Sequence, residues 1–145
     1  MTAPRCELEV LPAAPRVAAS PSARRAHSRW DALRCALQGL HGAWHGQPNL
    51  RLHVYVAAAV LLCGVWCRLA PMEWLWVSFA ISLVLVTELF NTAIEHTVDL
   101  VVGPALNPLA RQAKDIAAGC VLIAAVTAVV IGVFTFFPHL HLLGA

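Results

Sequence analysis

Three apolar stretches, each long enough to cross a bilayer, constrain the fold of this chain more than any other feature. They cover about residues 50–70, 72–100 and 114–137. A transmembrane helix needs about 20 apolar residues and satisfies all its backbone hydrogen bonds internally. Only 12% of the residues are charged, roughly half the share that is usual in a soluble domain. The sequence therefore predicts an all-α integral membrane protein with three transmembrane helices.

An amphipathic segment, residues 28–46, precedes the first stretch. Arginines lie on its polar face, and its apolar residues recur every three or four positions: Trp30, Leu33, Leu37, Leu40 and Trp44. The neighbouring spans favour an interfacial helix, although periodicity alone fits an ordinary packed helix almost as well. Residues 28–138 form the predicted membrane domain. Residues 1–27, rich in Pro, Ala, Ser and Arg, are predicted to be a disordered cytoplasmic tail, and residues 139–145 a short C-terminal tail with solvated histidines.

The basic residues indicate how the chain is oriented in the membrane. Seven of the ten Lys and Arg residues lie within residues 1–51, and two more, Arg111 and Lys114, lie between the second and third stretches. Only Arg68 falls on the other side. The positive-inside rule then predicts a cytoplasmic N-terminus. The formal net charge of +2 is too small to suggest a nucleic-acid partner.

Four polar residues share one face of the predicted second span. Glu88, Asn91, Glu95 and Asp99, here called the acidic stripe, are spaced by three, four and four residues. At about 100° per residue they fall within about 80° of one another. An ionised residue at mid-bilayer costs roughly 2.5–3.5 kcal/mol, so function is the first hypothesis for such a stripe. A polar seam between helices is the alternative, but seams use amides and hydroxyls, and a divalent cation relieves repulsion between acids.

A second pair, Lys114 and Asp115, lies just before the third span, and Lys114 is the only lysine of the chain. A lone lysine at a helix start is most often a solvated charge. Here it lies where the acidic stripe meets the cytoplasmic surface. Phosphoryl transfer needs a metal on acids, a cation on the phosphates and a carboxylate near the attacking hydroxyl. Neither glycine-rich nucleotide motif, GxxxxGK[ST] or GxGxxG, is present, so any nucleotide is held by another device.

These residues lie in two strings, residues 88–100 and 108–119, that resemble the prokaryotic diacylglycerol kinase family, which includes undecaprenol kinases. Residues 49–53 add a weaker match, and the similarity extends over about residues 28–138. The resemblance implies a homotrimer in the bacterial cytoplasmic (inner) membrane, with active sites shared between neighbouring subunits. It implies Mg²⁺- and ATP-dependent phosphorylation of a lipid alcohol, undecaprenol or diacylglycerol. The strings look closer to the undecaprenol kinase branch.

By position, the resemblance makes Glu88 the general base that takes the proton of the lipid hydroxyl, with Asn91 orienting that carboxylate or the lipid. It makes Glu95 the ligand of Mg²⁺ on the ATP phosphates. Gln47 stands where the family often has a second metal-binding glutamate. An amide oxygen can bind Mg²⁺ but brings no charge, so weaker metal binding is expected.

The nucleotide is expected to contact Glu95, Asp99, Lys114 and Asp115, with Lys114 neutralising the transferring phosphoryl group and Asp115 positioning Lys114. Two other functions stay open. An inactive family member could serve as a structural subunit, and a small proton-coupled transporter could use Glu88 alone. A transporter gives no role to the remaining acids and the lysine, and Mg-ATP dependence separates the kinase from both alternatives.

Overall fold

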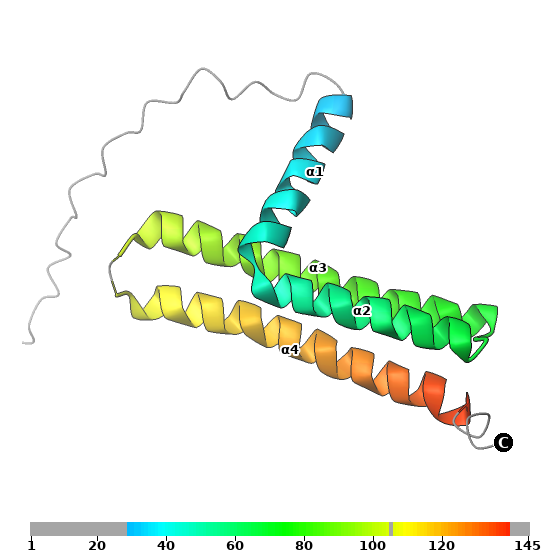
Figure 1. The fold of residues 1–145 in the computed structure, drawn as a ribbon. Coiled ribbons are helices and arrows are strands. Elements are labelled where there is room, and N and C mark those ends of the chain that lie inside the picture. Colours follow the sequence, from blue (N-terminus) through cyan, green and yellow to red (C-terminus); the bar gives the residue numbers. More distant parts are fainter. Residues whose placement is uncertain (1–28, 105, 140–145) are drawn as a thin grey trace, which may run out of the picture. The chain divides into compact units, whose positions relative to one another are not determined.

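The computed structural model describes residues 29–104 and 106–139, and this part of the chain is a series of helices (Figure 1). They are α1 (Arg29–Gly46), α2 (Pro48–Trp66), α3 (Pro71–Val102) and α4 (Pro108–Phe136). The segments Pro48–Trp66, Pro71–Val102 and Pro108–His139 are long and apolar enough to cross a membrane. The predicted all-α membrane fold with three spans is therefore confirmed. The predicted tail over residues 1–27, Ser28 and residues 140–145 lie outside the described residues.

Helix α1 forms where the amphipathic pattern predicts a helix, and none of its residues is buried. The chain divides within this helix, after Cys35, into two units. In the first unit, Arg29–Cys35 is an exposed helical segment. In the second unit, the end of α1 contacts the next helix, because the rings of Trp44 and Tyr55 meet edge to face at 6.0 Å.

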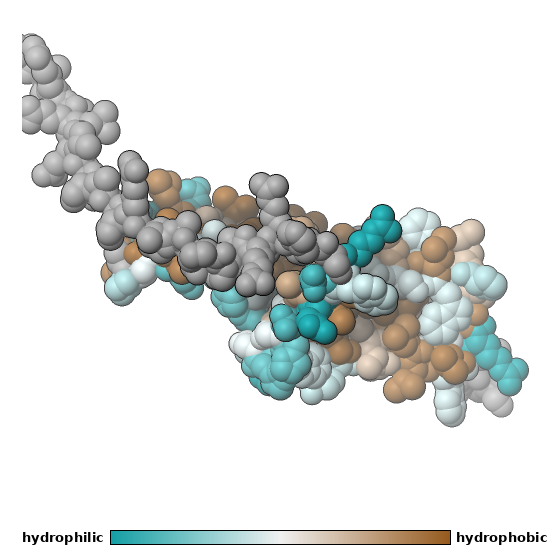
Figure 2. Space-filling view, turned by 90° about the horizontal axis from the view of Figure 1, so that it is seen from above, coloured by the Kyte–Doolittle hydropathy of each residue, from teal (hydrophilic) through white to brown (hydrophobic). Residues whose placement is uncertain are grey.

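Helix α3 is the centre of the second unit and packs against both α2 and α4, with consecutive helices antiparallel (Figure 1). The buried apolar residues between them are few: Leu50, Leu69, Val77, Ala80, Val84, Ala117 and Ala124. Many large apolar side chains face outward instead, and they occupy much of the surface seen in Figure 2. Such a surface is stable where acyl chains solvate it, since the hydrogen bonds of each helix are satisfied internally.

One end of the helices, here called the far end, is the turn between α2 and α3. Arg68 lies there in the left-handed region with φ 54°, and Glu73 Oε2 accepts a hydrogen bond of 2.7 Å from the Ala70 N–H at the start of α3. The same carboxylate lies 3.5 Å from His139 Nε2. His139 Nδ1 is 3.1 Å from the Thr135 carbonyl oxygen. His139 is therefore half-buried and joins the end of α4 to the start of α3, contrary to the prediction that it is solvated.

The opposite end, here called the site end, is where α3 stops and α4 begins. Gly103 ends α3 with φ 61°, and its N–H donates to the Asp99 carbonyl oxygen at 2.9 Å. Asn107 Oδ1 then caps α4, accepting from the backbone N–H groups two and three residues on at 2.9 and 3.3 Å. Pro108 fits the first helical position because its missing N–H is not needed there. These caps place Lys114 in the second turn of α4, close to the end of α3.

Candidate active site at the end of helix α3

The acidic stripe runs along α3 from the protein interior to its surface. Glu88 is 3% exposed and Asn91 6%, whereas Glu95 is half-buried and Asp99 is exposed. With 32 residues, α3 is roughly 48 Å long, well beyond the hydrocarbon core of about 30 Å. The stripe therefore joins a buried carboxyl group to water along a single helix face.

Asn91 links the buried and exposed parts of the stripe. Its Nδ2 donates to Glu95 Oε1 at 3.1 Å, across one helical turn. Its Oδ1, like the Oγ1 of neighbouring Thr92, is buried and has no hydrogen-bond partner among the described residues. Each unsatisfied buried polar atom costs about 1–3 kcal/mol. Each of these two buried side chains thus has an unsatisfied polar atom.

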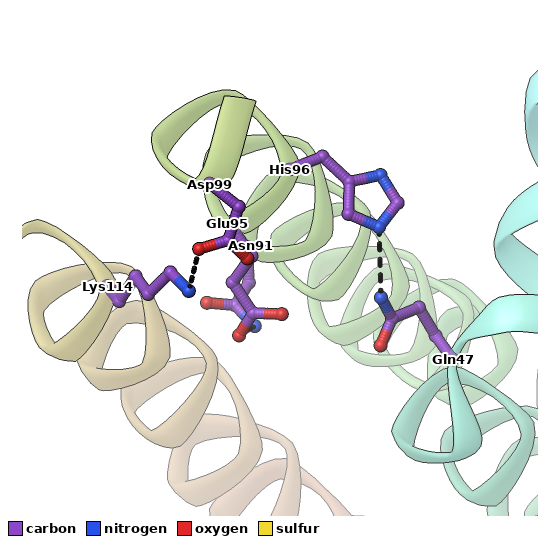
Figure 3. Close-up of polar contacts among 6 residues, drawn as sticks. All are labelled: Gln47, Asn91, Glu95, His96, Asp99 and Lys114. Carbon is purple, nitrogen blue, oxygen red and sulfur yellow. Dashed lines mark hydrogen bonds and ion pairs between the residues drawn. The ribbon is translucent and has the colours of Figure 1, made fainter. Parts of the chain in front are cut away.

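Lys114 is the cation of the site, and its partner is Asp99. Its Nζ donates to Asp99 Oδ1 at 2.5 Å, joining α4 to α3 (Figure 3). Asp115 contacts Arg111 at 3.7 Å instead, one turn away on the same helix. The side chains of that second pair are 71% and 86% exposed, so it contributes little to stability. The sequence predicts that Asp115 positions Lys114, whereas in the structure Asp99 is the residue that contacts it.

Gln47 approaches the same end of α3 from the N-cap of α2. Its Nε2 lies 3.4 Å from His96 Nε2 (Figure 3). His96 points toward α2, while Asp99 points toward α4 (Figure 3). Gln47 and Lys114 thus lie on two different sides of α3.

The donor set fits a metal ion that arrives with a phosphate ligand. Among residues 29–104 and 106–139 no three His, Cys, Asp or Glu side chains cluster in a way that could hold a metal by themselves. Mg²⁺ typically keeps several waters and binds one or two carboxylates together with substrate phosphates. Glu95 would supply such a carboxylate, and Asn91 donates a hydrogen bond to one of its two oxygens.

Comparison with known proteins identifies the family. A sequence model of the prokaryotic diacylglycerol kinase family matches residues 34–136. This chain belongs to that family. The undecaprenol kinase of Bacillus subtilis is 45% identical over 94 residues, which cover 65% of this chain and 76% of that protein. The diacylglycerol kinase of Synechocystis is 38% identical over 108 residues, 74% of this chain and 62% of that protein.

A more distant relative, the diacylglycerol kinase of Escherichia coli K12, is 26% identical over 102 residues, which cover 70% of this chain and 83% of that protein. Membership makes the protein a membrane-bound lipid kinase, with a lipid as substrate and a phosphoryl donor. The candidate site residues lie on α3 and α4, except Gln47 at the N-cap of α2, and all of them fall within the matched region.

Proposed function

We propose that this lipid kinase transfers the γ-phosphoryl group of Mg-ATP to the hydroxyl of a membrane lipid alcohol, at the end of helix α3. The observation that carries the proposal is the path along one face of α3, from the buried Glu88 to the ion pair of Asp99 with Lys114. A lipid hydroxyl approaches such a site from the membrane, and a nucleotide approaches it from water. Few other reactions need a site that a lipid reaches from the membrane and a nucleotide reaches from water.

In this mechanism Glu88 takes the proton of the lipid hydroxyl while that oxygen attacks the γ-phosphorus. The bond to ADP breaks, and its electron pair leaves on ADP. Asn91 orients the Glu88 carboxylate or the lipid, since its Oδ1 has no partner among the described residues. General-base assistance of this kind contributes about 10²–10⁴-fold to a rate.

The nucleotide side of the proposed site consists of Glu95, Asp99, Lys114 and Asp115. Glu95, assisted weakly by Gln47, would hold Mg²⁺, which neutralises charge on the phosphates. Lys114 exchanges Asp99 for an oxygen of the transferring phosphoryl group, which it reaches because its side chain is 34% exposed. Asp99 and Asp115 then line the pocket and keep Lys114 near the phosphates.

The lipid alcohol that we propose is undecaprenol, with diacylglycerol as the second candidate. Support comes from the higher identity to the undecaprenol kinase of Bacillus subtilis, 45%, than to the diacylglycerol kinases of Synechocystis and Escherichia coli K12, 38% and 26%. Both lipids present a primary hydroxyl at the membrane interface. The difference between them therefore lies in the chains that the protein accommodates.

We also propose that the protein works as a homotrimer with shared sites in the bacterial cytoplasmic (inner) membrane, with its N-terminus in the cytoplasm and α1 at the interface. A single chain covers the acidic stripe only in part, since Glu95 is half-buried and Asp99 is exposed, which supports closure by a neighbour. Nine of the ten basic residues lie on the proposed cytoplasmic side, where ATP is available.

Phosphate transfer from labelled Mg-ATP by the purified protein tests the proposal, with undecaprenol and diacylglycerol offered separately. We expect transfer to undecaprenol and a loss of about 10²-fold or more in Glu88→Gln. Glu73→Gln makes the same chemical change at the far end of α3, and it should retain activity. Transfer to diacylglycerol alone would reassign the substrate. If a folded oligomer transfers phosphate to neither lipid, the enzyme proposal is wrong and a structural role becomes the better explanation.

A further inference from the structure

Two histidines lie one helical turn apart near the end of α1. His41 and His45 are four residues apart, so at about 100° per residue their side chains leave the helix only about 40° apart. Both are exposed, and their ring centroids lie 4.5 Å apart, with the ring planes inclined by 56°. Neither imidazole has a hydrogen bond or an ion pair with any described residue. The pair therefore presents two imidazoles, side by side, to a ligand from outside the chain.

The separation of the two rings is close to what a shared metal ion requires. An imidazole nitrogen binds Zn²⁺ at about 2.0–2.1 Å, so two imidazoles on one tetrahedral ion have ring centres roughly 5 Å apart. The rings of His41 and His45, at 4.5 Å, are near this value. Two histidines at the same spacing on a helix bind zinc in the H-E-x-x-H motif. Gly42 stands in place of the glutamate of that motif, so we infer metal binding without hydrolysis.

The ligand type decides which ions suit the pair. Imidazole suits Zn²⁺, Cu²⁺ and Ni²⁺, whereas Mg²⁺ prefers oxygen ligands. The pair is therefore chemically distinct from the proposed Mg²⁺ site at Glu95. No third His, Cys, Asp or Glu joins a metal-binding cluster within the described part of the chain, so water completes the coordination shell. An ion with two protein ligands is held less tightly than one in a four-ligand structural site.

The pair lies on the flank of α1, beside its apolar stripe. In the second unit this stripe consists of Leu37, Leu40 and Trp44, and the centre of the histidine pair lies about 90° around the helix from it. An interfacial helix buries its apolar face in the boundary between headgroups and acyl chains. With α1 at the interface, as proposed, both imidazoles are at the level of the headgroups, where ions from water reach them.

We propose that His41 and His45 together bind one divalent transition-metal ion, of which Zn²⁺ is the probe, and that the ion ties together the helical turn between them. Gly42 weakens this turn, because glycine inside a helix loses more conformational freedom on folding than any other residue. No residue of α1 is buried to compensate. A ligand that binds only the folded turn stabilises it. This metal site does not depend on the proposed phosphoryl transfer.

A Zn²⁺ titration of the full-length protein in detergent, followed by the imidazole ¹⁵N resonances, tests the site. We expect the resonances of His41 and His45 to shift together with a single affinity, while an equal concentration of Mg²⁺ shifts neither. Loss of a group that only supports a metal ligand costs about 10–100-fold in affinity. His41→Gln and His45→Gln each remove a ligand, so each should weaken Zn²⁺ binding by at least about tenfold. Zn²⁺ should also slow amide hydrogen exchange at the end of α1 in the unaltered protein and not in these variants.

Gly42→His combined with His45→Gln is the matched control for the spacing. It keeps two histidines in α1, and nothing lies within 4 Å of a Cβ atom placed at Gly42. Adjacent residues of a helix do not face each other. This variant should therefore bind Zn²⁺ as weakly as His45→Gln alone.

Two outcomes would overturn the metal site. One is equal Zn²⁺ affinity in the spacing control and the unaltered protein. The other is a His45 resonance that responds to Zn²⁺ equally well in His41→Gln, which would mean that each histidine binds the ion by itself. Kinase activity enters neither readout, so a failure of the proposed function would leave this result unchanged.

Discussion

At the scale of single residues, the site contains buried polar groups that an ordinary membrane interior lacks. The stability of the fold alone does not explain why they are there. Glu88 is 3% exposed, and two further buried polar atoms next to it, on Asn91 and Thr92, have no partner among the described residues. A buried charge costs several kcal/mol unless it is paired. Function accounts for such groups where packing does not, because a substrate supplies the missing partners only when it binds.

A substitution at Gln47 tests how strongly the site binds Mg²⁺. Gln47→Glu adds a carboxylate at the site end of α3, beside His96, and carboxylates bind Mg²⁺ better than amides because they carry charge. We expect the Mg²⁺ concentration for half-maximal activity to fall by about tenfold, the low end of what a change in a ligand's hydrogen-bonded partners does to metal affinity. The measurement is a Mg²⁺ titration of kinase activity. Gln38→Glu on α1 is the control for charge alone, and equal effects of both changes would mean that Gln47 is not a ligand.

At the scale of helices, the sequence predicted which elements form better than how they meet. Pro48, Pro71 and Pro108 each stand at the first position of a helix, where proline is favoured. The apolar stretches predicted the starts of α2 and α3 closely, but α4 begins at Pro108, before the predicted start near residue 114. The pairing of Lys114 with Asp99 and of His139 with Glu73 depends on the register between α3 and α4. Periodicity within one helix does not contain that register. The acids could therefore be found, but not their partners.

The contact between α2 and α3 at the far end depends on Gly64. A Cβ atom there would lie 2.8 Å from Trp74 Cη2 and 3.1 Å from Leu69 Cδ1. We expect Gly64→Ala to lower the free energy of unfolding by about 1–3 kcal/mol, as overpacked positions do. Gly132→Ala is the matched control, because nothing lies within 4 Å of that position. Thermal unfolding in detergent measures both, and equal midpoints for the two variants would contradict the close packing.

The cap of α4 connects helix stability to the site. Asn107 Oδ1 accepts two backbone hydrogen bonds at the start of α4, seven residues before Lys114. Asn107→Ala should cost about 0.5–2 kcal/mol and raise KM for ATP severalfold, because a frayed first turn moves Lys114 away from the phosphates. Asn107→Asp keeps an accepting oxygen and should stay close to the unaltered protein in stability and KM. If Asn107→Ala and Asn107→Asp have the same stability and the same KM for ATP, the cap of α4 does not position Lys114.

At the scale of the whole molecule, three spans bring the acidic stripe and Lys114 to one end of the helices and leave Arg68 at the other. Hydropathy and the positive-inside rule predicted this arrangement from sequence, because both depend on composition along the chain. What they could not supply is the oligomeric state, since many outward-facing side chains are large and apolar on every span. Lipid and a second copy of the chain cover such surfaces equally well.

The orientation in the membrane decides whether the site reaches ATP, and labelling measures it directly. Leu106 lies in the α3–α4 turn and is fully exposed, at 102%, while Arg68 lies in the exposed turn at the far end. Leu106→Cys and Arg68→Cys, each made in a protein whose own five cysteines are replaced, form a matched pair.

With the N-terminus in the cytoplasm, a membrane-impermeant maleimide should label only Arg68→Cys in right-side-out vesicles and only Leu106→Cys in inverted ones. The distribution of basic residues gives the reason, since nine of ten are then cytoplasmic. The reverse pattern would place Lys114 and the acidic stripe on the side without ATP. Because the proposed reaction needs cytoplasmic ATP, that single result would contradict both the orientation and the donor.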